Sequence, residues 1–155
     1  MRLVASMLLI AGSTGAQSGP NFDARAAQAV IDGCAAHSAA KHQSEAIAVV
    51  DTGGHLIAAL RMDGNGSGIM DFAMAKAQAA AAWGFSTAQM AKAAKSTPGF
   101  AGAPDVVTVP GGVPVWTADG RVRVGAIGVS GEAPQDDEEC ANAGINAAGM
   151  RNDHS

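Results

Sequence analysis

The strongest constraint on the fold is a hairpin signal that occurs twice in the chain. Four short apolar runs form two pairs, and a glycine-containing turn separates the members of each pair: 45–51 with 55–62, and 113–117 with 121–130. Short runs rich in β-branched residues on either side of such turns are typical of antiparallel strand pairs. The sequence therefore predicts two β-hairpins.

Helical periodicity fills the segments before, between and after these hairpins. Apolar residues recur at three- and four-residue spacing, or helix-forming residues dominate, in 23–41, 69–83, 86–95 and 134–149. The glycine-rich segment 63–68 and the proline- and glycine-rich segment 96–112 are predicted to be loops. The simplest assembly is an α/β (α+β) fold in which one largely antiparallel sheet of four or five strands packs against N-terminal, central and C-terminal helices. This arrangement resembles profilin-like or PAS-like architecture.

The N-terminus has the pattern of a secretory signal peptide. Arg2 precedes the apolar run 3–11, and small and polar residues follow it as far as Gln17. We expect cleavage after Ala16, so that residues 1–16 are the signal peptide and 17–155 form a single domain in the periplasm or outside the cell. No later apolar run reaches the length of about 20 residues that a membrane-spanning helix needs.

Net charge and side-chain size bear on the partners of the mature chain. Without Arg2, nine of the ten Lys and Arg residues remain against fourteen Asp and Glu, a formal charge of −5. Nucleic acid and anionic membranes need a basic face, so neither is an expected partner. The chain has four Phe, two Trp and no Tyr. A core built from small side chains buries less area per residue, which favours a homo-oligomer that hides further surface.

Two cysteines, Cys34 and Cys140, lie in the first and last predicted helices. They can pair in an oxidising compartment if these helices lie side by side on one face of the sheet, or remain buried thiols. Neither is part of a CxxC motif, so no zinc or other metal site is expected.

The densest polar group follows the first hairpin. Arg61, Met62 and Asp63 end the second apolar run, and Lys76 follows thirteen residues after Asp63. If the glycine loop folds back over the next helix, two cations and one acid meet at a rim that suits a carboxylate such as a haem propionate. The alternative is a surface ion-pair cluster.

Histidine and methionine are the candidate haem ligands in this sequence. His37 lies at the edge of the apolar stripe of the first helix and His42 follows the same helix, so both are axial candidates. A role at the helix C-terminus is the alternative for each. Met70 and Met74 are spaced four apart, which is typical of core packing. The GxSxG, HExxH and P-loop motifs of familiar enzyme classes do not occur.

Six sequence blocks together resemble the GlcG/HbpS-like family. In chain order they are AVVDTGGHLIAALRMDG (48–64), KA (76–77), WGFST (83–87), PGGVPVWTADG (110–120), VGAIGVSG (124–131) and DEECANAGI (137–145). The resemblance covers about residues 22–148. It implies a small α/β sandwich that forms homo-oligomers, with extracellular haem-binding members and a related C-terminal domain in PduO-type cobalamin enzymes. Ile69 and Ala79 depart from the family pattern, because each stands where a hydroxyl side chain is expected.

The sequence and this resemblance together favour a secreted, ligand-binding protein that binds, senses or stores haem or a related tetrapyrrole and is not an enzyme. The expected ligand-binding residues are Arg61, Met62, Asp63 and Lys76 with the turn Gly111–Gly112. One alternative is a lyase, isomerase or hydratase acting on a small carboxylate, with Asp63 as base and Arg61 and Lys76 holding the anion. The other is a structural module whose oligomer is the function.

Overall fold

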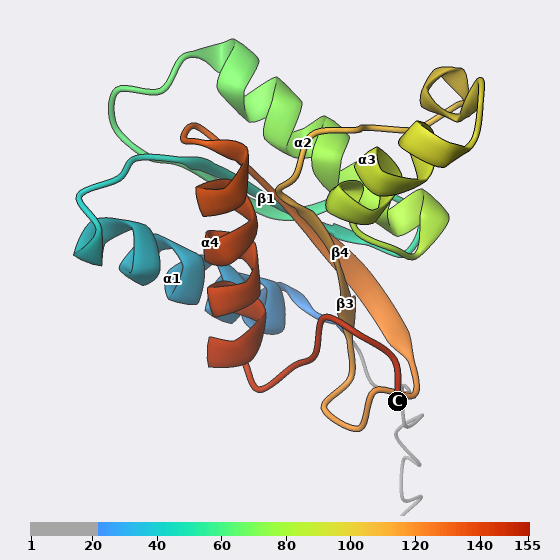
Figure 1. The fold of residues 1–155 in the computed structure, drawn as a ribbon. Helices are drawn as coiled ribbons and strands as arrows, with labels where there is room; N and C mark the ends of the chain where they lie inside the picture. The colour runs from blue at the N-terminus through green and yellow to red at the C-terminus, as the bar shows by residue number, and fades with distance from the viewer. Residues whose placement is uncertain (1–21) are drawn as a thin grey trace, which may run out of the picture.

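The computed structural model describes residues 22–155 as a four-stranded antiparallel sheet with helices on both faces (Figure 1). The predicted signal peptide lies outside the described residues. The strands are β1 (Ala46–Asp51), β2 (Leu56–Arg61), β3 (Gly112–Trp116) and β4 (Arg123–Ser130), in the spatial order β2-β1-β4-β3. Both predicted hairpins are present, and the antiparallel pairing of β1 with β4 joins them into one sheet.

The helices divide between the two faces of the sheet. They are α1 (Ala24–Ala40), α2 (Ser67–Trp83), α3 (Thr87–Ser96) and α4 (Pro134–Ala147), and the loop 96–112 contains one short 3-10 helix, η1 (Phe100–Gly102). Figure 1 shows α1 and α4 side by side on one face, while α2 crosses the other. No helix among residues 22–155 is long and apolar enough to cross a membrane.

The core consists of one apolar layer on each side of the sheet. Larger side chains, such as Ile31, Ile127 and Ile145, fill the layer under α1 and α4. The layer under α2 is almost entirely alanine. A Cβ at Gly128 would overlap the carbonyl oxygen of Ala73, so the missing side chain lets α2 approach β4 closely.

Local contacts define several helix ends. Asp23 caps α1 by accepting a hydrogen bond from the Ala26 amide at 2.9 Å, and Gly84 ends α2 in the left-handed conformation with φ at 75°. Ser86 and Gln89 form a reciprocal capping box at the start of α3. These short-range contacts mark where α1 and α3 begin and where α2 ends.

Candidate functional site

The predicted ligand rim begins at the exposed end of β2. The Arg61 side chain is exposed and donates to the carbonyl oxygen of Asn65, which holds the glycine-rich loop against the strand. Met62 is half-buried, and its amide donates to the carbonyl oxygen of Glu45 at 3.0 Å. Asp63 is exposed, and its carbonyl oxygen accepts from Ser44 Oγ at 2.6 Å. Among residues 22–155, the Asp63 carboxylate forms no ion pair.

Lys76 lies inside the molecule. Its side chain is 1% exposed, and Nζ donates to Asp137 Oδ2 at 2.6 Å and to the Val129 carbonyl oxygen at 2.8 Å. The Asp137 side chain is 2% exposed, and its Oδ1 accepts from the Glu132 amide at 3.1 Å. Burial raises the pKa of Asp137, although the Lys76 ammonium opposes that shift. The pair links α2, β4 and α4 through a charge-assisted hydrogen bond.

The turn Gly111–Gly112 packs directly on Lys76. Gly111 has φ at 122°, a conformation that L side chains rarely adopt, and a Cβ there would lie 2.9 Å from Lys76 Nζ. The Gly112 amide donates to Thr87 Oγ1 at 2.9 Å. The structure therefore brings Lys76, Gly111 and Gly112 together in the interior.

The predicted rim residues thus occupy two places. Arg61, Met62 and Asp63 lie at the exposed end of β2, whereas Lys76 is enclosed and neutralised by Asp137. No ion pair joins the two groups in the described part of the chain. The role of these residues in ligand binding stays a prediction, and a ligand anion at Lys76 would have to compete with the Asp137 carboxylate.

The two axial candidates differ in exposure. His37 is half-buried in α1, and its Nε2 is buried without a hydrogen-bond partner among the described residues. His42 is exposed in the turn after α1, with φ at 58°. The His42 side chain is therefore open to solvent, whereas Nε2 of His37 is enclosed.

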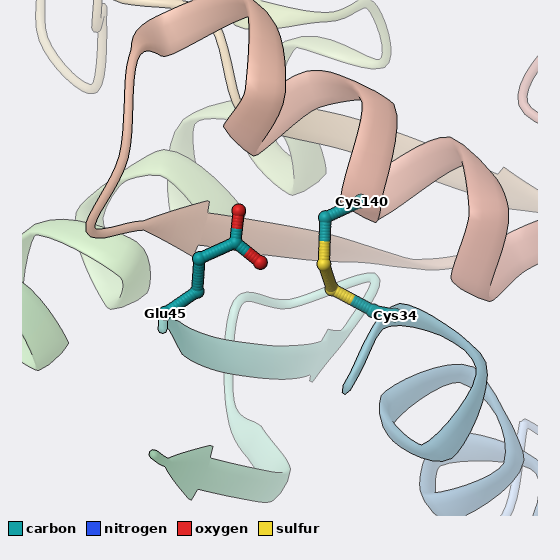
Figure 2. Close-up of side chains that lie close together, drawn as sticks. All are labelled: Cys34, Glu45 and Cys140. Carbon is teal, nitrogen blue, oxygen red and sulfur yellow. A yellow bond between two sulfur atoms is a disulfide. The ribbon is translucent and has the colours of Figure 1, made fainter. Parts of the chain in front are cut away.

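A disulfide joins Cys34 and Cys140 and ties α1 to α4 (Figure 2). The two Cα atoms are 4.6 Å apart, within the range that a disulfide spans. Both residues are fully buried. The condition that the sequence left open, a shared face for the first and last helices, is therefore met.

A buried carboxyl group lies beside this disulfide. Glu45 is 0% exposed, and the Ser38 hydroxyl contacts its Oε2, the Cys34 carbonyl oxygen at 3.2 Å and Cys140 Sγ at 3.1 Å. Burial raises the pKa of Glu45 from 4.5 to about 7, against the opposing effect of the Ser38 hydrogen bond. A hydroxyl has one proton to donate, so a protonated Glu45 supplies a second donor to this group of contacts.

Two polar pockets lie on the surface, away from the predicted rim. One of about 480 Å³ lies between α3, α4 and the C-terminal segment, and its polar lining residues include Ser86, Lys92, Glu138 and Asn142. Burial raises the pKa of Glu138. A second pocket of about 370 Å³ lies nearby beside Trp116 and His154. Neither includes a residue that the sequence singled out for binding.

Sequence reasoning missed the inward-facing polar residues Asp137, Glu45 and Ser38. An acid in the first turn of a helix commonly complements the helix dipole, but the spacing of three and four from Asp137 to the buried Cys140 and Ala141 places it on the apolar face. Ser38 has the same spacing of four to the buried Cys34. These helical spacings were the available signal, whereas nothing in the sequence around Glu45 distinguishes it from an exposed acid before a strand.

Comparison with known proteins places the chain in a family. The model of the family described as "Haem degrading protein HbpS-like" matches residues 22–146. A search of the curated proteins gives no match. These findings confirm the resemblance that the six sequence blocks carry.

Solved structures share the fold over most of their length. A double mutant of HbpS from Streptomyces reticuli is 30% identical, with a TM-score of 0.74 over 93% of this chain and 97% of that chain. A PduOC:heme complex is 20% identical, with a TM-score of 0.78 over 86% of this chain and 99% of that one. The Klebsiella pneumoniae protein ORFY is 21% identical, with a TM-score of 0.75 over 88% and 97%. The predicted α+β fold is thereby confirmed.

Proposed function

Since this chain belongs to the HbpS-like family, we propose that it binds haem or a closely related tetrapyrrole. The observation that carries the proposal is the family match over residues 22–146. The PduOC:heme complex adds support, because its chain has the same fold. The family description names haem degradation, but binding is the step that must come first, and the proposal is limited to it.

The exposed end of β2 combines the two properties that a tetrapyrrole with carboxylate side chains needs. Arg61 is exposed there and pairs in register with Ala46 of β1. Ala46 belongs to the apolar layer against which Ile69, Met70 and Met74 pack, and these three side chains are only partly buried. A propionate at Arg61 would therefore place the ring next to apolar surface. In this proposal Lys76 stabilises the packing of α2, β4 and α4 from inside, and Arg61 is the cation that binds the propionate.

Titration of the oxidised chain with haemin tests this proposal. We expect a shift of the Soret band that saturates. Arg61→Ala should weaken binding by about 1–3 kcal/mol, because a charge-assisted contact is lost. Arg121→Ala removes another exposed arginine, from the turn between β3 and β4, and serves as the matched control. If the Soret band does not shift, haem binding is wrong; if Arg61→Ala binds like the control, only the position of the site is wrong.

We also propose that the chain is exported. A buried disulfide forms and persists in oxidising compartments, which supports the signal peptide inferred for residues 1–16. The exported protein should begin near Gln17, and intact-mass analysis that finds Met1 retained would exclude cleavage.

A homo-oligomer is the expected assembly. β2 is an edge strand that leaves Leu56 55% and Leu60 37% exposed, and apolar edges of this kind favour pairing with another chain. Light scattering measures the assembly: the mass of a multimer is expected, and the mass of a single chain at all concentrations would contradict it.

A further inference from the structure

Cys34, Glu45 and Cys140 form a cluster of potential metal ligands between α1, α4 and the sheet (Figure 2). All three side chains are fully buried, and one ligand atom from each lies within 4.8 Å of the others. The residues come from α1, the position before β1, and α4. The cluster therefore exists only in the folded chain.

One oxygen atom of the Glu45 carboxyl group takes no part in the hydrogen bonds of this cluster. Ser38 contacts Oε2 of Glu45, whereas Oε1 is buried without a hydrogen-bond partner among residues 22–155. An unsatisfied buried polar atom costs about 1–3 kcal/mol, so native proteins keep few of them. Figure 2 shows the carboxyl group extending toward the two sulfur atoms. The carboxyl group that carries this oxygen thus lies beside the two sulfur atoms.

We propose that reduction of the Cys34–Cys140 disulfide creates a buried metal site in which two thiolates and the Glu45 carboxylate bind one Zn²⁺-like cation. A dithiol reductant breaks the S–S bond by transferring two electrons and two protons, and itself becomes a disulfide. Metal binding then releases both thiol protons to solvent, together with the Glu45 proton where the carboxyl group carries one.

The donor set determines the kind of cation. Two thiolates and one carboxylate suit Zn²⁺, which binds sulfur and oxygen ligands in tetrahedral sites. The Ser38 hydroxyl, 3.1 Å from Cys140 Sγ, is an adjacent oxygen that could take the fourth position. The bound cation would link α1 to α4 in place of the disulfide, and the two states exclude each other because disulfide sulfurs are not thiolates.

The fold brings the three ligands together, although they are far apart in the sequence. The absence of a CxxC motif predicted no zinc site, and the two cysteines are 106 residues apart. The packing of α1 against α4 brings them together, and β1 begins directly after the third ligand.

Cobalt titration of the full chain tests the proposal, because tetrahedral Co²⁺ reports thiolate ligation by its charge-transfer and visible absorption bands. The chain is reduced with dithiothreitol, and the reductant is removed under argon before Co²⁺ is added. The reduced chain should show both sets of bands, saturating at one equivalent, and Zn²⁺ should abolish them. The oxidised chain should show none. No haem is present, so the result is independent of haem binding.

Two variants distinguish a specific site that includes Glu45 from nonspecific binding of the metal by the two thiols. Glu45→Gln keeps both cysteines but should weaken Co²⁺ binding about tenfold or more, while Asp32→Asn, which removes an exposed carboxyl group of α1, should bind as wild type does. Circular dichroism measures how much of the fold the reduced chain keeps. If the reduced chain stays folded, Co²⁺ binding supports the site. If it is partly unfolded, recovery of the folded spectrum on addition of Co²⁺ supports the site. Absence of the bands, equal affinity in Glu45→Gln, or equal affinity in the urea-unfolded chain would overturn it.

Discussion

Replacing Lys76 by Met should destabilise the fold strongly, because it leaves the Asp137 carboxylate buried without its cation. The Lys76–Asp137 pair is almost fully enclosed, at 1% and 2% exposure, with 2.6 Å between Nζ and Oδ2. Breaking such a pair by removing one partner costs about 3–5 kcal/mol. The Val129 carbonyl oxygen also loses the donor that lies 2.8 Å away. We therefore expect the free energy of unfolding to fall by about 3–5 kcal/mol at neutral pH.

The pH dependence of this loss has a definite sign. Burial already raises the pKa of Asp137 above 3.8, and removal of the ammonium that lowers it raises that pKa further. A carboxyl group whose pKa is raised in the folded state favours folding in its protonated form, so its contribution is lost as pH rises through the folded pKa. Lys76→Met should therefore be closer to wild type at about pH 5 than at about pH 8.

Urea denaturation followed by circular dichroism, with the disulfide intact, measures these differences. The double variant Lys76→Met/Asp137→Leu replaces both charges by apolar groups and should lose much less than the sum of the single variants. Single variants within about 0.5 kcal/mol of wild type, the range of ordinary surface substitutions, would refute the reasoning.

Three further predictions concern the packing around the sheet. Replacing Cys34 and Cys140 by Ala opens a loop of 106 residues and should lower the free energy of unfolding by about 4–5 kcal/mol on the chain-entropy model; a loss below about 1 kcal/mol in urea denaturation would contradict it. In the oxidised chain, the protonated form of Glu45 favours folding, because burial raises its pKa in the folded state. The free energy of unfolding should therefore fall by about 3 kcal/mol as pH rises from 4.5 to about 7. Urea denaturation at several pH values measures this fall, which should be absent in Glu45→Gln. Gly128→Ala forces a Cβ against the Ala73 carbonyl oxygen and should cost about 1–3 kcal/mol in thermal or urea unfolding, whereas Gly102→Ala, which meets no atom within 4 Å and needs no positive φ, serves as the control.

The fold was predictable because its signals are local. Hairpin turns, helix caps and apolar periodicity each involve residues a few positions apart, as at Gly84 after α2 and Ser86 before α3. The predicted sheet of four or five strands has four, whereas the pairing of β1 with β4 that joins the two hairpins was not predicted, because several strand orders can join two hairpins.

The polar interior was not predictable in the same way. Whether Lys76 faces solvent or Asp137 depends on how α2 and α4 approach β4, and the two residues are 61 positions apart. The environment of Glu45 likewise arises from α1, α4 and the strand together. Charged residues are mostly exposed in proteins, so a sequence alone predicts exposure for them. The buried Lys76–Asp137 pair and the buried Glu45 are exceptions to that expectation.

The most direct test of haem binding is the number of haem groups that stay with the oxidised chain through gel filtration. The chain is incubated with excess haemin, separated from free haemin, and assayed for haem and protein in the same fractions. Specific haem binding predicts a saturating, whole-number ratio of haem to chain that is the same at two haemin concentrations. Elution of the chain without haem, or a ratio that keeps rising with the haemin added, would contradict it.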